Sequence, residues 1–181
     1  MTLVNITSLV FSILTILGQV FVLFLLVYFI VMRQKSSDKI LKFVSDKAII
    51  YSLIVSMLAT LGSLWYSEVL GFEPCKLCWF QRIFMYSQAL IFIVAILKKD
   101  KNVFYYSFIL SVFGGAIALY HYLLQLGLVP GTSCGVVGYS VSCAKKFVLQ
   151  FGYITIPMMT LTAFLMIILF GIISKFSKSS N

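Results

Sequence analysis

The sequence predicts an all-α protein that crosses a membrane several times. Hydrophobic residues make up 61% of the 181 residues and charged residues only 10%, whereas a soluble domain contains about 25% charged residues. The charges also fall between long apolar runs, and a transmembrane helix needs about 20 apolar residues. This composition excludes a disordered chain, which combines low hydrophobicity with high charge. It also argues against a soluble enzyme, because too little polar surface is available to cover one.

The first three spans are predicted from gaps between charged residues. Residues 1–32 carry no charge, and residues 48–67 form a second uncharged run. The third run, 83–97, is short, but apolar residues extend it back to Trp79 or Phe80. The first run has no basic segment before it and no clear cleavage site, so we expect a retained helix rather than a signal peptide.

The last two spans follow from the same rule. Residues 102–144 contain no Lys, Arg, Asp or Glu, but this run is too long for one helix and is broken by Gly and Pro after residue 126. Residues 147–174 form the last uncharged run. The predicted spans are 8–32, 48–67, 80–97, 102–125 and 153–174.

Basic residues predict the orientation of these spans. Ten of the fourteen lie on one side of the predicted membrane: Arg33, Lys35, Lys39, Lys42, Lys47, Lys98, Lys99, Lys101, Lys175 and Lys178. Cytoplasmic loops carry an excess of Lys and Arg, so the N-terminus is expected outside a bacterial cell membrane and the C-terminus in the cytoplasm. The basic residues that give the net charge of +9 are therefore expected to contact anionic lipid and to fix the topology. No nucleic-acid partner is predicted.

All four cysteines fall in the two predicted outer loops, 68–79 and 126–147. Cys75 and Cys78 form a C-x-x-C pair at the start of a span, where thiol pKa values are often lowered. Cys134 and Cys143 are separated by eight residues. The outer side of a bacterial membrane is oxidising, so disulfides persist there. Thiol–disulfide exchange is favoured over two alternatives, structural loop disulfides and a zinc site of four thiolates. No metal is expected, because C-x8-C is a poor zinc knuckle.

Two polar residues are predicted near the outer end of the bundle. Arg82 lies four residues after Cys78, one turn deeper on the same helix face. It either extends to the lipid headgroups or stabilises a Cys78 thiolate and the negative oxygen of a reduced acceptor. His121, the only histidine, is either an interfacial polar residue or a partner of a quinone-like carbonyl. An aromatic belt is predicted at this depth from Trp65, Tyr66, Trp79, Tyr120 and Tyr122.

Three segments carry a resemblance to a known family. Residues 74–82 (PCKLCWFQR), 120–125 (YHYLLQ) and 151–157 (FGYITIP) resemble the DsbB family of membrane disulfide-bond-formation proteins, and look closest to its BdbC-type branch. The resemblance covers about residues 46–174 and implies a four-helix bundle. Residues 1–45 would then be an extra N-terminal helix with a basic cytoplasmic loop, and residues 175–181 a short tail.

The resemblance also implies an enzyme that oxidises a DsbA-like thioredoxin-fold partner and passes two electrons to a membrane quinone, menaquinone or ubiquinone. Cys134 would form the mixed disulfide with the partner, and Cys143 would resolve it with transient exchange onto Cys75. Cys78 would react with the quinone, with Arg82 and His121 beside its headgroup. The catalytic residues are therefore expected to be Cys75, Cys78, Cys134 and Cys143, and the quinone-binding residues Arg82, His121 and Cys78.

Two other functions remain possible on the sequence alone. A vitamin K epoxide reductase-like protein also couples cysteine pairs to a quinone, but its quinone-proximal C-x-x-C looks to follow the loop pair, whereas here it comes first. A non-enzymatic multi-span protein would use the cysteines only as structural loop disulfides. The predicted spans contain no acidic residue, although a transporter often needs one inside the membrane, and this favours the enzyme.

Overall fold

Five long helices make up the computed structural model, which describes residues 3–32, 39–100, 102–129 and 142–179. All five are long and apolar enough to cross a membrane, so the all-α, multi-span prediction is confirmed. One short π-helical segment, η1, directly follows α2. The elements are α1 Leu3–Met32, α2 Lys39–Leu64, η1 Trp65–Val69, α3 Lys76–Lys98, α4 Val103–Leu126 and α5 Ile156–Ser179.

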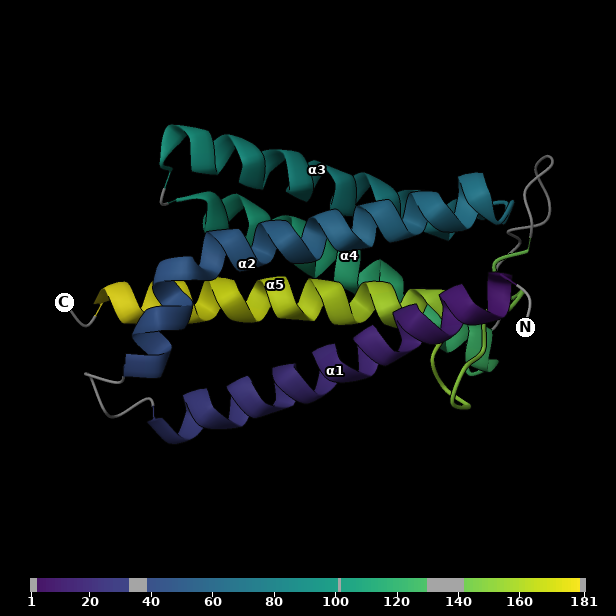
Figure 1. Cartoon of the computed structure of the whole chain (residues 1–181), viewed down its shortest axis with the longest axis horizontal. Helices are drawn as coiled ribbons and strands as arrows, with labels where there is room; N and C mark the ends of the chain where they lie inside the picture. The colour runs from purple at the N-terminus through teal and green to yellow at the C-terminus, as the bar shows by residue number, and fades with distance from the viewer. Residues whose placement is uncertain (1–2, 33–38, 101, 130–141, 180–181) are drawn as a thin grey trace.

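Successive helices run in opposite directions along one common axis (Figure 1). The start of α1 and the connection between α2 and α3 lie at one end of the molecule, and α5 begins at this end too. The connection between α3 and α4 and the end of α5 lie at the opposite end. This alternation places the start of the chain and Cys75 at the same end, as the charge pattern predicted.

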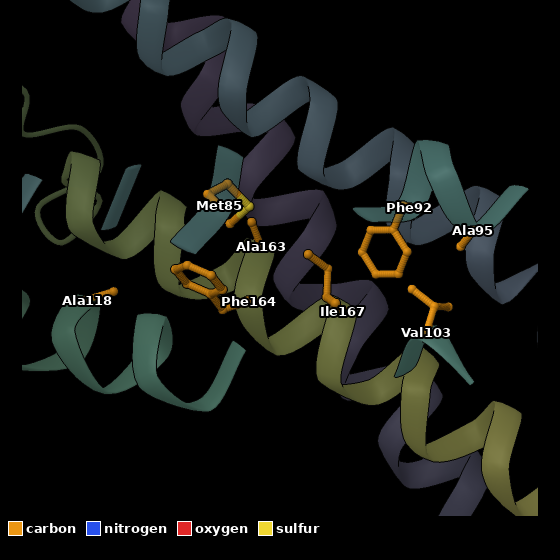
Figure 2. Close-up of a cluster of buried hydrophobic side chains, with 8 residues drawn as sticks. All are labelled: Met85, Phe92, Ala95, Val103, Ala118, Ala163, Phe164 and Ile167. Atoms are coloured by element: carbon orange, nitrogen blue, oxygen red, sulfur yellow. The ribbon is translucent and has the colours of Figure 1, made fainter. Parts of the chain in front are cut away.

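Helices α2 to α5 form a bundle around one hydrophobic core. Its buried members are Met85, Phe92, Ala95, Val103, Ala118, Ala163, Phe164 and Ile167 (Figure 2). Phe164 is fully buried, and a Cβ added at Gly114 would overlap its ring. Glycine at this position therefore allows α4 to approach α5 closely. Small residues allow such close approach of helices in membranes.

Helix α1 lies against the outside of this bundle, mainly along α5. Gln19 donates a hydrogen bond to the Thr162 hydroxyl at 3.3 Å and accepts one from the Tyr153 hydroxyl at 2.9 Å. Phe11 contacts Tyr66, with ring centroids 5.5 Å apart. Tyr66 is only 5% exposed, so its predicted place in an aromatic belt is wrong, because Phe11 of α1 packs on its ring.

Several helix ends differ from the predicted spans. Helix α2 begins at Lys39, nine residues before the uncharged run, because a helix continues beyond the apolar region when lysine side chains can reach the headgroups. Helix α5 begins at Ile156 rather than residue 153, because Phe151 and Gly152 adopt positive φ values of 52° and 79° and form a turn. Helix α3 begins at Lys76, so Cys78 lies in its first turn and not in a loop.

Candidate thiol site at the start of α3

Cys75 is the N-cap residue of α3. Its backbone is extended, with φ −73° and ψ 172°, and its sulfur accepts a hydrogen bond from the backbone N–H of Cys78 at 3.4 Å. An N-cap side chain satisfies one of the unpaired N–H groups of the first helical turn. The C-x-x-C spacing thus fixes Cys75 at the helix boundary and Cys78 one turn inside it. Both sulfurs lie at the positive end of the helix dipole, which favours negative charge.

The two sulfurs of this pair are 3.1 Å apart, and the Cys75 thiol donates to Cys78. A disulfide requires about 2.05 Å, so a small movement is enough to join them. The hydrogen bond to Cys78 raises the pKa of the Cys75 thiol to about 12, and burial adds to this effect, while a hydrogen bond with His121 opposes it. In the reduced pair, Cys75 therefore holds its proton, and Cys78 is the sulfur on which negative charge is stabilised.

His121 of α4 is held between three partners. Its Nε2 lies 3.0 Å from the carbonyl oxygen of Cys143 and 3.7 Å from the sulfur of Cys75. Its Nδ1 lies 2.9 Å from the side-chain nitrogen of Gln81. An amide nitrogen can only donate, so Nδ1 accepts from Gln81 and Nε2 carries the imidazole proton. The Nε2–H group then donates to the Cys143 carbonyl and faces the Cys75 sulfur. His121 and Gln81 are 1% and 4% exposed.

Cys143 joins the same cluster from the segment that follows α4. It is buried and packs with Cys75 and Leu124, and Cys78 packs against this group. The side-chain amide of Gln125 donates to the backbone oxygen of Lys145 at 3.2 Å, which ties this segment to the end of α4. Three of the four predicted cysteines are therefore brought together. The fourth, Cys134, lies outside the described residues.

Arg82 lies one turn below Cys78 and is fixed by α2. Its Nε donates to the Ser63 hydroxyl at 2.9 Å, and its Nη2 donates to the Ser63 carbonyl at 3.0 Å. The guanidinium also lies over the Trp79 ring, 5.3 Å from the centroid. The side chain is only partly exposed and turns inward to a neighbouring helix. These contacts differ from those of an arginine that only extends to the headgroups.

Cys78 and Arg82 line one small pocket, of about 60 Å³, between α2, α3 and the start of α5. The hydroxyl of Tyr86 is buried at this pocket and has no hydrogen-bond partner among the described residues. His121 does not line the pocket; it lies on the Cys75 side of the cysteine pair. The sequence predicted Arg82 and His121 together beside one headgroup; of the two, only Arg82 lines this pocket.

Sequence reasoning missed three residues of this site. Gln81 stands three residues after Cys78 and Tyr86 eight after it, and both spacings return to the same helix face. A signal for these two was therefore present in the sequence. Ser63 is on another helix, and nothing in the sequence indicates that its carbonyl meets Arg82.

The cluster also has a donor set that suits a soft metal ion. The sulfurs of Cys75 and Cys78 and a ring nitrogen of His121 lie within 4.8 Å of one another. Zinc binds Cys at about 2.3 Å and His at about 2.0–2.1 Å, so modest movement would bring all three to one ion. The zinc alternative was predicted with four thiolates, whereas the described residues offer two thiols and one imidazole.

Cys75, Cys78 and Cys143 pack together at one end of a multi-span helical bundle, and the buried His121 imidazole faces the Cys75 sulfur and the Cys143 carbonyl. This arrangement defines a membrane protein with a thiol site. Residues 45–174 match the family model described as disulfide bond formation protein DsbB. The chain belongs to the DsbB family.

Curated relatives support this assignment. Disulfide bond formation protein C of Bacillus subtilis is 42% identical over 130 residues, which cover 71% of this chain and 92% of the relative. The SPbeta prophage-derived disulfide bond formation protein B of Bacillus subtilis is 43% identical over 118 residues, 65% of this chain and 77% of the relative. Probable disulfide formation protein C 1 of Bacillus anthracis is 43% identical over 115 residues, 62% of this chain and 80% of the relative. No solved structure matches.

Proposed function

We propose that this protein oxidises a DsbA-like thioredoxin-fold partner outside the cytoplasm and passes the two electrons to a membrane quinone. One observation carries the proposal. Among the described cysteines, Cys78 alone both lines the pocket with Arg82 and lies 3.1 Å from a second thiol. A sulfur in this position can receive electrons through the neighbouring thiol and pass them to an acceptor in the pocket.

The thiol steps follow from the order of the cysteines. In the oxidised enzyme, Cys134 is bonded to Cys143 and Cys75 to Cys78. A partner thiolate attacks the Cys134 sulfur, which forms the mixed disulfide and releases Cys143 as a thiolate. Cys143 then attacks Cys75, so a Cys143–Cys75 bond forms and the Cys75–Cys78 bond breaks. The leaving thiolate is Cys78. The burial of Cys143 against Cys75 supports this exchange.

His121 is suited to assist this exchange. Its Nε2–H group lies between the Cys143 carbonyl and the Cys75 sulfur, so it can donate to Cys75 when the Cys143–Cys75 bond breaks and Cys75 leaves as a thiolate. Gln81 keeps the proton on Nε2 by donating to Nδ1. The partner's second thiolate then attacks the partner sulfur of the mixed disulfide and frees the Cys134 thiolate. Cys134 attacks Cys143, so the Cys134–Cys143 bond forms again, the Cys143–Cys75 bond breaks, and Cys75 and Cys78 are left as the reduced pair. The partner thereby loses two electrons and two protons, and the enzyme gains them.

The residues at the pocket fit a quinone. When bound, a quinone supplies an acceptor for two electrons and two protons and leaves as the hydroquinone. Cys78 lines the pocket, and the Arg82 guanidinium provides positive charge for a developing negative oxygen. The Tyr86 hydroxyl, which has no partner among the described residues, can donate to a carbonyl. A DsbA-type partner is strongly oxidising, at about −120 mV, so its reoxidation needs an acceptor at least as oxidising, and a quinone meets this requirement.

The test is reconstitution of the whole reaction. Purified protein in detergent is mixed with a reduced DsbA-like protein and a quinone, and quinone reduction is followed by absorbance. We expect turnover that is abolished by Cys78→Ala, and a mixed disulfide trapped on Cys134 when the partner lacks its second thiol. Stable loop disulfides, no quinone reduction and Cys→Ala variants that only impair folding would instead favour the non-enzymatic alternative.

A further inference from the structure

Helix α1 has no role in the proposed reaction, and it lies outside the matched residues 45–174. Together with α2 and α5 it nevertheless borders an open cavity of about 510 Å³. The lining of this cavity is mostly apolar and includes Phe11, Gly18 and Phe21 of α1. We call this cavity the α1 cleft.

The α1 cleft lies between α1 and α2 because α1 packs mainly on α5 and makes few close contacts with α2. Near the start of α1, the Phe11 ring sits over Gly62, where an added Cβ would come within 2.9 Å of the ring. Near the end of α1, Leu25 is buried against Val44 and Phe170. Small residues line the intervening stretch, so the space between the helices is not filled by side chains. They are Thr15, Gly18, Ala59, Gly62, Ser63 and Ala163.

The α1 cleft adjoins the pocket that holds Cys78 and Arg82. The two cavities share five lining residues: Ala59, Ser63, Tyr66, Ile156 and Thr160. Ser63 is also the residue that fixes the Arg82 guanidinium. The pocket of about 60 Å³ is too small for an ordinary ligand, whereas the two adjoining cavities together fall within the range of about 300–1,000 Å³ of small-molecule sites.

The shape of these two adjoining cavities matches one kind of molecule. The small cavity carries a thiol and a guanidinium, and the large one is long, mostly apolar and inside the membrane span. Along α2 and η1 the lining of the α1 cleft extends from Val55 to Tyr66, a length of about 16 Å at 1.5 Å per residue. We infer that the α1 cleft binds the prenyl tail of the quinone whose ring is reduced at Cys78. This inference rests on the proposed function for the identity of the headgroup.

Helix α1 then converts a groove that would face lipid into a site walled by protein on three sides. Lipid tails are as apolar as leucine, so a tail gains little from the hydrophobic effect when it leaves the bilayer, and binding depends on close packing. Side chains that narrow the α1 cleft should therefore weaken binding of tailed quinones and leave tail-less quinones unaffected. Gly18 is suited to this test, because its Cβ would point toward Met166 and Thr162, at 3.4 Å from each.

The experiment uses the full chain in lipid nanodiscs with a quinone that carries a photoreactive group in its prenyl tail. Adducts are mapped by mass spectrometry. We expect labelling of Leu14 and neighbouring cleft residues, displaced by excess unlabelled prenyl quinone but not by a tail-less quinone. Gly18→Phe should reduce the labelling at least about fivefold. Val20→Phe, at a 59% exposed position outside the cleft, should not change it.

Turnover provides the second measurement. Gly18→Phe should raise the apparent KM for a prenyl quinone at least about fivefold and leave the KM for a tail-less quinone unchanged. If Gly18→Phe does not accumulate, Leu58→Phe narrows the α1 cleft from α2, with lipid-facing Leu61→Phe as its control.

The outcomes separate the two proposals. Labelling spread over all lipid-facing surfaces, or cleft labelling by a photoreactive phospholipid that prenyl quinone does not displace, would overturn the tail site. Turnover of both quinones would then still support the proposed function. Displaceable labelling in the α1 cleft without any turnover would support the tail site and count against the oxidase.

Discussion

Replacing Cys78 with alanine is expected to lower the pKa of the Cys75 thiol. In the reduced protein that pKa is raised to about 12, chiefly because the thiol donates to the Cys78 sulfur. At pH 8 only about one Cys75 side chain in ten thousand is then a thiolate, compared with about one in four for an ordinary thiol of pKa about 8.5. Alanine cannot accept the hydrogen bond from the Cys75 thiol, whereas burial still raises the Cys75 pKa. We expect the pKa to fall by at least about one unit, which means at least about tenfold more thiolate at pH 8.

The assay is alkylation of the reduced protein by iodoacetamide, which reacts with thiolates. Trypsin cuts after Lys76 and Arg82, so Cys75 and Cys78 appear in different peptides. Initial rates at Cys75 are measured from about pH 6 to pH 10.5. In the wild type the rate should rise about tenfold per pH unit without a plateau, because the pKa lies above this range. In Cys78→Ala the rate should begin to level off within it. Only the shape of the rate against pH is read for each variant, so a difference between variants in the access of iodoacetamide to Cys75 does not affect the result.

Cys78→Ser is the matched control. A hydroxyl can still accept a hydrogen bond, so its profile should lie between those of the wild type and Cys78→Ala. A wild-type plateau near pH 8.5, unchanged in Cys78→Ala, would refute the reasoning. Cys75 would then not hold the proton, and Cys78 would lose its assignment as the sulfur that carries negative charge.

Four further predictions address the surroundings of the thiols. Gln81→Leu leaves Nδ1 of buried His121 without a hydrogen-bond donor, so the free energy of unfolding should fall by about 1–3 kcal/mol, measured by thermal unfolding. The same change should slow thiol oxidation, measured by stopped flow. Arg82→Ala should raise the apparent KM for quinone about tenfold or more with the protein still folded, since the guanidinium held by Ser63 is lost; a change confined to expression level would favour an interfacial anchor. Tyr86→Phe should raise the same KM about threefold without lowering the melting temperature, because its hydroxyl has no partner in the described protein; an unchanged KM would argue against a carbonyl contact. Purified protein should contain much less than one zinc per chain and keep its activity after chelation, whereas stoichiometric zinc by elemental analysis, with unfolding on its removal, would establish a structural metal site.

The spans of this protein were predictable because lipid imposes a simple rule. Buried backbone in hydrocarbon must be helical, so uncharged runs of sufficient length gave all five helices. Their ends were less predictable. Lys39 begins α2 well outside the uncharged run, and the turn at Phe151 delays α5. These positions depend on side chains that reach the headgroups and on local turn geometry, and hydropathy records neither.

The candidate site was predictable only where it is local in sequence. The C-x-x-C pair and Arg82 share one helix, so their spacing already placed them on one face. The contact of His121 with Gln81, and of Arg82 with Ser63, depends on how three helices pack. The α1 cleft is less predictable still, because it results from small residues on α1, α2 and α5 that leave a space between them. No sequence motif marks such a cavity, because it depends on how the helices pack.

One face of α3 nevertheless connects these features. Cys78, Gln81, Arg82, Met85 and Tyr86 all line the same pocket, and their spacing of i, i+3, i+4, i+7 and i+8 is that of a single helical stripe. A soluble amphipathic helix would place apolar residues there. Here the stripe begins with a thiol and continues with an amide, a guanidinium, a thioether and a phenol. Such polar groups inside a membrane span are costly unless they serve each other or a ligand. The amide and the guanidinium have protein partners, whereas the phenol has none among the described residues, and this points to a polar ligand atom at the inner end of the stripe.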